Sequence, residues 1–251
     1  MDLELKHPVA LVPTMGALHA GHASLIEIAR KFSSEVVVSI FVNPLQFENP
    51  NDFSAYPKSV DADVALATAS GATKIWVPTF DEIYPSDPVL ISSGEIGNLF
   101  EGVHRFGHFD GMLTVVKRLF DLVTPKYAIF GEKDFQQLFL IKAIADGVEI
   151  VTAPTFREPD GMAASSRNTR LTEEARVAAT VIFRALQGAG SEDQLRQMLA
   201  TEPLFQLDYA DFIDEVDFTH AHSGTQNVRA IVAGWINGVR LIDNMRMELR
   251  A

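Results

Sequence analysis

Residues 9–22 read VALVPTMGALHAGH, a short apolar run followed at once by a turn and two histidines. An apolar run of this length, bounded by turn residues, is typical of a buried parallel strand. Beyond the turn, apolar residues recur at helical spacing at Leu25, Ile28, Ala29 and Phe32. The stretch therefore predicts a strand that leads directly into a helix, which is the building unit of open α/β sheets.

Further apolar runs continue this pattern along the first part of the chain. They are residues 36–42, 74–77, 127–130 and 148–152. Segments of helical period lie between them, and one, from Met112 to Val123, stops before Pro125, because the residue before a proline disfavours the helical conformation. Alternating strands and helices predict a doubly wound parallel sheet.

The pattern changes in the last part of the chain. A loop rich in glycine, serine and charge leads to two helices, predicted to begin near Thr172 and Ser191. Ser191 and Gln194 have the spacing of a capping box, and apolar alternation farther on predicts short strands. We therefore expect an α/β protein with a doubly wound parallel sheet in residues 1–156 and a smaller C-terminal α+β domain in residues 157–251.

Composition restricts the classes of function. The 251 residues carry a net charge of −12, which argues against broad nucleic-acid binding because phosphate contacts need a basic face. The absence of cysteine excludes disulfides and thiolate metal sites. No apolar run approaches the roughly 20 residues that cross a bilayer, and Asp2 and Glu4 stand where a secretory signal would be basic. We expect a cytoplasmic protein without nucleic-acid or membrane partners.

The turn after the first strand has the features of a phosphate site. His19 and His22 are three residues apart, so both imidazoles can face the same side of the first helical turn. Gly21 between them lets a base or a phosphate approach the backbone. Unpaired N–H groups and the helix dipole favour negative charge there, which suits a nucleotide triphosphate. Neither G-x-G-x-x-G after a strand nor G-x-x-x-x-G-K-[ST] occurs in the chain.

Two other interpretations of the histidine pair stay open at this point. Two histidines at this spacing can bind zinc, although the chain has no cysteine and no third ligand stands nearby in the sequence. They can also be polar capping residues without a function. The residues that follow the other strands help to decide between these interpretations.

Polar side chains follow two further predicted strands. Asn43 and Gln46 come after the second strand and offer uncharged donors and acceptors for a small hydroxy acid, although Asn-Pro is also ordinary turn chemistry. After the fourth strand, Lys133 can reach phosphate oxygens, Asp134 can accept from ribose hydroxyls, and Gln137 lies one helical turn beyond. Since the carboxyl ends of parallel strands meet at one edge of a sheet, we expect these side chains to converge with the histidines.

The loop around Ser165, Ser166 and Arg167 carries the last candidate group. Two hydroxyls and a guanidinium on a glycine-containing loop can fold over a polyphosphate and pair with its charge. The alternative is a surface linker with turn residues.

Taken in order, five motifs resemble those of one family. They are PTMGALHxGH, SIFVNPxQF, GHF, FGEKDFQQL and DGxAxSSRN. The chain is similar to the pantoate–β-alanine ligases (pantothenate synthetases), within the H-x-G-H nucleotidyltransferase superfamily, from about Val9 to Asn244. The resemblance implies a Rossmann-like N-terminal domain, a small lid-like C-terminal domain and a homodimer. It also implies an ATP-dependent ligase that condenses (R)-pantoate with β-alanine to pantothenate through a pantoyl adenylate, releasing AMP and pyrophosphate.

The resemblance further implies which residues form the site. Those that would bind ATP are Met15, Gly16, Ala17, Leu18, His19, Ala20, Gly21, His22, Gly131, Glu132, Lys133, Asp134, Phe156, Ala164, Ser165, Ser166 and Arg167. Four of these would act in catalysis, namely His19, His22, Lys133 and Arg167, with His22 in an acid role. Gln46 and Gln137 would hold pantoate, and Gln46 would also lie beside β-alanine. Asp63 would help to bind Mg²⁺.

The resemblance also suggests further contributors, and the chain departs from it at two positions near the site. Asn43, Arg105 and His108 are further contributors that the resemblance suggests. Phe106 stands where the family generally has proline, and Ala164 replaces a larger apolar residue, so the loops that carry them are the places where this chain departs from the pattern.

Rival functions make different use of the same residues. A nucleotidylyltransferase that joins AMP to a phosphorylated acceptor would share the H-x-G-H motif, but it would leave Gln46 and Gln137 without a carboxylate to bind. A nucleotide-binding or regulatory protein without catalysis would bind ATP and consume no β-alanine, which the intact Lys133 and Arg167 disfavour. Length and charge disfavour a tRNA synthetase.

Overall fold

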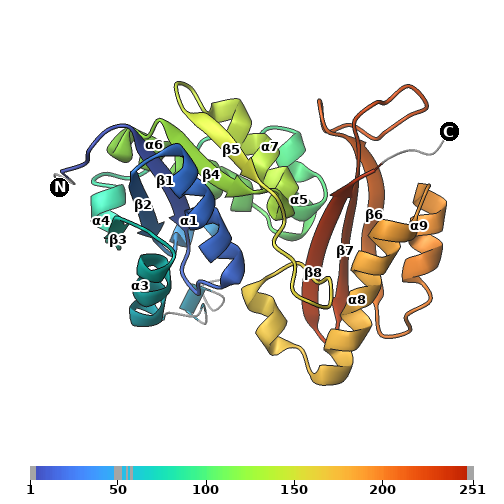
Figure 1. The fold of residues 1–251 in the computed structure, drawn as a ribbon. Coiled ribbons are helices and arrows are strands. Elements are labelled where there is room, and N and C mark those ends of the chain that lie inside the picture. The colour runs from blue at the N-terminus through green and yellow to red at the C-terminus, as the bar shows by residue number, and fades with distance from the viewer. Residues whose placement is uncertain (1–3, 48–52, 55, 57–58, 248–251) are drawn as a thin grey trace. The chain divides into compact units, whose positions relative to one another are not determined.

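The computed structural model describes residues 4–47, 53, 54, 56 and 59–247, so Asp2 lies outside the described residues. The chain divides into two compact units, Met1–Pro154 and Thr155–Ala251. Figure 1 shows a sheet with flanking helices in each unit. The two units are described one after the other.

The first unit is built on a parallel sheet of five strands, which confirms the predicted fold class. In sheet order the strands are β3 (Lys74–Trp76), β2 (Glu35–Ile40), β1 (Val9–Thr14), β4 (Tyr127–Gly131) and β5 (Glu149–Ala153). After β1, the chain adds β2 and β3 on one side of it and then β4 and β5 on the other side. The topological switch point therefore lies between β1 and β4. In open α/β sheets, ligands bind outside the carboxyl ends of the strands at this point.

Helices cover both faces of this sheet. The helix α1 (Ala20–Phe32) and α3 (Val60–Ala69) share one buried cluster with β1, β2 and β4, through residues such as Ile26 and Ala67. The opposite face of the sheet carries α6 (His108–Val123). The ring of Phe120 in this helix packs against the ring of Phe130 in β4, with 6.5 Å between the two ring centroids. The helix α7 (Phe135–Ile144) packs against α6.

Short elements connect these layers at the carboxyl edge of the sheet. They are the helices α4 (Phe80–Ile83) and α5 (Glu101–His104) and the 3₁₀ turns η1 (Pro44–Gln46), η2 (Ile96–Asn98) and η3 (Glu132–Asp134). The predicted stop of α6 before Pro125 is confirmed: Thr124 takes a left-handed conformation (φ +45°) and its N–H donates to Phe120. The strand β2 ends at Ile40, two residues earlier than predicted.

The second unit is the predicted small α+β unit. Its antiparallel sheet has the order β6 (Gln206–Asp214), β7 (Val228–Ile236) and β8 (Val239–Arg246). The helices α8 (Glu173–Gly188) and α9 (Glu192–Leu199) share one hydrophobic core with the sheet, and the 3₁₀ turn η4 (Ser166–Arg170) precedes them.

Helix capping in this unit follows the prediction in part. Thr172 caps α8, and Ser191 caps α9 by accepting from the N–H of Gln194. The Gln194 side chain accepts from the N–H of Gly190 rather than of Ser191, so the reciprocal half of the predicted capping box is displaced by one residue. Within the described part of the chain, no helix is both long enough and apolar enough to span a membrane.

Candidate active site

The two histidines form the cap of α1. His19 is the N-cap residue, and its Nδ1 accepts from the N–H of Gly21 at 3.1 Å. The Nδ1 of His22 accepts in turn from the N–H of His19 at 3.3 Å. The two ring centroids are 4.2 Å apart. The pair is therefore a capping box in which imidazoles replace the usual serine and glutamate, and both rings lie at the carboxyl end of β1.

This geometry sets the protonation state of the imidazoles. Because each Nδ1 accepts a hydrogen bond, each neutral ring carries its proton on Nε2. Burial and then the neighbouring His19 lower the pKa of His22 to about 3. His22 is therefore neutral at pH 7, where it can donate a hydrogen bond to an anion but contributes no positive charge. The geometry supports such a donor better than the acid role that the resemblance implies.

A buried carboxylate holds the turn between β1 and α1. Gly16 and Ala17 have left-handed backbones, with φ of +85° and +52°. Asp63, in the first turn of α3 and only 2% exposed, accepts from the N–H of Ala17 at 2.9 Å and from the N–H of Leu18 at 2.7 Å. Ser59 donates to the same carboxylate at 3.2 Å. The N–H groups of Ala17 and Leu18 thus point at Asp63, and any contact of these residues with ATP must use other atoms.

Asp63 is a poor fit for the predicted Mg²⁺ ligand. Its two oxygens already serve three donors and are almost completely buried. Among the described residues there is no group of three or more histidines, aspartates or glutamates that could hold a metal. Mg²⁺ in nucleotide enzymes commonly keeps several waters and is bound largely by substrate phosphates, so it can accompany ATP without such a group of residues.

The end of β2 lies beside the end of β1, and Asn43 and Gln46 follow it. The N–H of Phe41 donates to the carbonyl of Thr14 at 3.0 Å. Asn43 is completely buried, and its Nδ2 donates to Oε1 of Gln46 at 3.2 Å and to the carbonyl of Gly111 at 3.0 Å. Since Oε1 of Gln46 is occupied, Nε2 is the atom of this carboxamide that can serve a ligand as donor.

Neighbouring side chains support this pair. Tyr84 donates to Oδ1 of Asn43 at 3.4 Å, and burial raises the pKa of Tyr84, so its hydroxyl remains a donor. The Nδ1 atom of His108 lies 3.0 Å from the carbonyl of Gln46. Asn43 also caps η1 through the N–H of Leu45, which confirms the turn interpretation of this residue. Nothing in the sequence around Tyr84 signalled its part.

The residues after β4 lie near the histidine cap. Lys133 and Asp134 belong to η3 and its end, and the charges of both act on the pKa of His22. Lys133 Nζ is 3.5 Å from Asp134 Oδ1, and the lysine side chain is 17% exposed. The strands β1 and β4 are parallel neighbours in the sheet, so their carboxyl ends lie at one edge as predicted. Gln137 follows one turn later in α7 and is partly exposed.

The adjacent Gln136, which no sequence motif singled out, also has a structural part near the site. Its side chain is buried and donates to the carbonyls of Ile96 and Leu99 at 2.7 and 2.8 Å, while it accepts from the N–H of Glu101 at 3.1 Å. Gln136 therefore fastens the segment from η2 to α5 onto α7. Consecutive helical residues point about 100° apart, so the two neighbouring glutamines face in different directions, and the motif alone does not show which of them is buried.

The loop with Arg105 and His108 keeps a defined turn. The N–H of His108 donates to the carbonyl of Arg105 at 3.0 Å, and Gly107 takes a positive φ of +71°. Phe106, the predicted departure from the family pattern, is 76% exposed. Its side chain therefore contributes little to the packing of the first unit.

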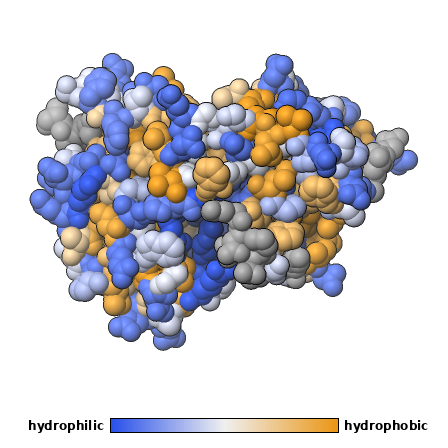
Figure 2. Space-filling model, turned by 180° about the vertical axis from the view of Figure 1, so that it is seen from behind, coloured by the Kyte–Doolittle hydropathy of each residue, from blue (hydrophilic) through white to orange (hydrophobic). Residues whose placement is uncertain are grey.

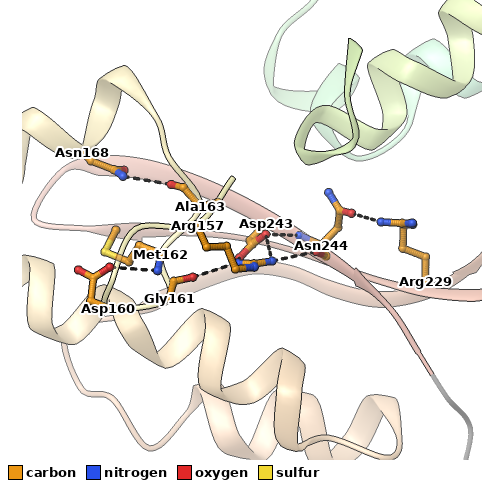
Figure 3. Close-up of polar contacts among 9 residues, drawn as sticks. All are labelled: Arg157, Asp160, Gly161, Met162, Ala163, Asn168, Arg229, Asp243 and Asn244. Carbon is orange, nitrogen blue, oxygen red and sulfur yellow. Dashed lines mark hydrogen bonds and ion pairs between the residues drawn. The ribbon is translucent and has the colours of Figure 1, made fainter. Parts of the chain in front are cut away.

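The five remaining predicted site residues belong to the second unit. Ser165 caps η4 by accepting from the N–H of Arg167 at 3.3 Å, and Arg167 itself is exposed. The N–H of Ala164 donates to the carbonyl of Phe156 at 2.9 Å. Figure 3 shows the neighbouring polar contacts, which join residues 157–168 to the strand β8. Ala164 is buried, whereas Ser165 and Ser166 are partly exposed.

The fold and the histidine cap together define an α/β protein of the H-x-G-H nucleotidyltransferase class. The family model described as pantoate-β-alanine ligase matches residues 2–246. The chain belongs to this family.

Individual relatives agree with this assignment. The chain is 48% identical over 264 residues to the pantothenate synthetase of Acidothermus cellulolyticus, which covers 97% of this chain and 87% of that protein. The structure of the Thermus thermophilus pantothenate synthetase matches with a TM-score of 0.88 at 40% identity, covering 95% of this chain and 93% of that one. The Francisella tularensis pantoate-β-alanine ligase, solved with beta-gamma ATP and β-alanine, matches with a TM-score of 0.81 at 35% identity. The match covers 98% of this chain and 91% of that one.

Proposed function

We propose that this protein condenses pantoate with β-alanine at the expense of ATP, through a pantoyl adenylate, and releases AMP and pyrophosphate. The observation that carries the proposal is the family match over residues 2–246. The relative solved with beta-gamma ATP and β-alanine supports the choice of substrates.

The histidine cap and Lys133 are proposed to bind the ATP phosphates. The pantoate carboxylate is already ionised at pH 7, so adenylate formation needs alignment and charge neutralisation rather than a strong base. His19 and His22 supply Nε2–H donors, and Lys133 supplies positive charge. Loss of one donor of this kind commonly lowers the rate by about 10²–10³-fold. The position of the three groups at the switch point of the sheet supports this role.

Gln46 and Gln137 are proposed to hold pantoate. The contact with Asn43 orients the Gln46 carboxamide so that Nε2 serves as the donor to pantoate, and Gln46 also lies beside β-alanine. Asn43 acts through Gln46 rather than on the substrate, because it is completely buried.

The second unit is proposed to act as a lid. Phe156, Ala164, Ser165 and Ser166 contact the nucleotide, and Arg167 pairs with its phosphates. An acyl adenylate hydrolyses readily, so exclusion of water protects it until β-alanine attacks the acyl carbon and expels AMP. The attacking amine must be neutral, and a desolvated environment favours that form.

Three finer expectations belong with this proposal. Mg²⁺ accompanies ATP through its phosphates, the protein is cytoplasmic, and it forms a homodimer. Several large apolar side chains of the first unit are exposed and are available to an interface of this kind. They include Val89 at 88%, Val103 at 67% and Phe106 at 76% exposure. Figure 2 shows hydrophobic residues gathered in groups on the face seen from behind.

The test is a reaction with ATP, Mg²⁺, pantoate and β-alanine in which each component is omitted in turn. We expect pantothenate and AMP only in the complete mixture. Labelled pyrophosphate should exchange into ATP when pantoate is present and β-alanine is absent. Pantothenate formation without exchange would refute a free adenylate. A product in which AMP is joined to a phosphorylated acceptor would identify a nucleotidylyltransferase, and ATP binding without turnover would identify a non-catalytic protein.

A further inference from the structure

The geometry points to Arg157 and Asp243 as positioning residues, whose ion pair shapes the loop that presents Ser165, Ser166 and Arg167 (Figure 3). The inference rests on the proposed role of these three residues at ATP. We call residues 156–164, together with Asn168, the frame of the loop. Every contact used below lies within the second unit.

One guanidinium joins three parts of this unit. Arg157 donates twice to Asp243 of β8, from Nη1 to Oδ2 at 2.7 Å and from Nη2 to Oδ1 at 3.1 Å. Its Nη1 also donates to the carbonyl of Gly161 at 3.0 Å. Its central carbon lies 4.5 Å from the ring centroid of Phe183 in α8. Arg157 therefore links the tip of its own turn to the sheet and to a helix.

The frame is a tight reversal of the backbone. Arg157 and Ala163 form an antiparallel bridge, and the N–H of Glu158 donates to the carbonyl of Met162 at 2.9 Å. Gly161 closes the turn with φ +88°, where a Cβ would lie 2.0 Å from the Phe183 ring. The reversal ends at Ala164, whose N–H donates to Phe156. The turn therefore delivers the chain to Ser165 in one defined direction.

A second attachment follows the functional residues. The Nδ2 of Asn168, a side chain that is only 6% exposed, donates to the carbonyl of Ala163 and to Oε1 of Glu158, both at 3.1 Å. The three residues from Ser165 to Arg167 thus stand between two fixed points, Ala164 and Asn168. The frame therefore sets the orientation of these three residues, and the contact of Arg157 with Asp243 fixes the frame to β8.

Asp243 is well suited to this task because it is itself anchored. It is 5% exposed, and its Oδ1 also accepts from the N–H of Asn244 at 2.8 Å. Asn244 in turn accepts from Arg229 of β7, which is paired with Glu215. A planar guanidinium that is bound in bidentate fashion fixes direction as well as distance, which a lysine cannot reproduce.

The test uses Asp243→Asn in the full-length protein, with Asp208→Asn as the matched control. Asp208 accepts from Arg240 in the same sheet at 3.0 and 2.8 Å, and this pair is similarly buried, with exposures of 13% and 14%. Hydrogen exchange of the Glu158 and Ala164 amides is measured without substrates, and kcat and KM for ATP are measured separately.

We expect Asp243→Asn to speed exchange of both amides by about tenfold or more and to lower kcat by about 10–100-fold through misplacement of the loop. Asp208→Asn should leave both readouts unchanged. Asp243→Glu, which keeps the charge, should recover part of kcat. If Asp243→Asn does not fold, Arg157→Lys takes its place with the same expectations.

Equal exchange and kinetics in the two asparagine variants would overturn the inference, as would faster exchange without loss of kcat. Because exchange is followed without substrates, its outcome does not depend on the proposed reaction. Inactive wild-type protein with the expected exchange pattern would refute the proposed function while leaving the frame in place.

Discussion

The histidine cap of α1 and the loop around Arg167 hold their functional groups in opposite ways. In the cap, His19 and His22 build the structure with Nδ1, and they are also the residues proposed to bind the phosphates. In the loop, Arg157 and Asn168 build most of the structure and Ser165 caps η4, whereas the side chain of Arg167 is exposed. Function and stability are therefore coupled at the histidine cap and separable at Arg167.

The largest effect is expected at the cap. His22→Ala removes a phosphate donor and one half of the capping box, so turnover should fall by about 10³-fold and the free energy of unfolding by about 1 kcal/mol. Steady-state kinetics and thermal unfolding measure the two effects. His22→Asn is the control, because its side-chain oxygen can accept from the N–H of His19; stability should recover and activity should not. Full activity of His22→Ala would remove His22 from the site.

Arg167→Ala should lower turnover by about 10²-fold, with a change in unfolding free energy of less than about 0.5 kcal/mol. The exposed side chain contributes little to packing, so chemistry alone is affected. Arg167→Lys keeps the charge but loses the bidentate geometry, so its turnover should lie between that of the wild type and that of Arg167→Ala. A loss of stability as large as that of His22→Ala would contradict the separation of function from structure in this loop.

Asp63→Asn tests whether the cap depends on its buried carboxylate. The amide can no longer accept from both Ala17 and Leu18, so we expect kcat/KM for ATP to fall by about tenfold and stability by about 1–3 kcal/mol. The Mg²⁺ concentration for half-maximal activity should stay as in the wild type. A marked shift of that concentration would instead identify Asp63 as a metal ligand.

The smallest expected effect on activity near neutral pH comes from the titration of His22. The pKa of His22 is about 3 in the folded protein and near 6.5 when unfolded, so the unfolded chain binds the extra proton between these values. Stability should therefore decrease as pH falls from about 6.5 toward 3 through this residue. The His22 ring should show no titration by NMR between pH 5 and 8. An inflection in the pH–rate profile within that range that His22→Asn abolishes would contradict a neutral His22.

Several features of the fold were predictable because they depend on short-range physics. The apolar runs of β1, β2 and β4, the end of α6 before Pro125, and the caps at Thr172 and Ser191 each involve residues within a turn or a strand of one another. The approach of Lys133 to the histidine cap was also predictable, since parallel strands bring their carboxyl ends to one edge.

The long-range contacts of the site residues could be identified only from the tertiary structure. Asp63 holds Ala17 from 46 positions away, and Arg157 meets Asp243 across 86. Asn43 was interpreted correctly as a turn residue, but its burial and its contact with Gln46 depend on how α6 packs.

The sequence by itself determined the order of strands and helices, the location of the candidate site and the family, because hydrophobic period, capping chemistry and motif spacing are written in neighbouring residues. Only the tertiary structure decided that Asp63 serves backbone donors, that His22 is neutral, and that Asp243 supports the loop of Arg167. Burial and long-range pairing set these properties, and both arise only when distant segments pack together.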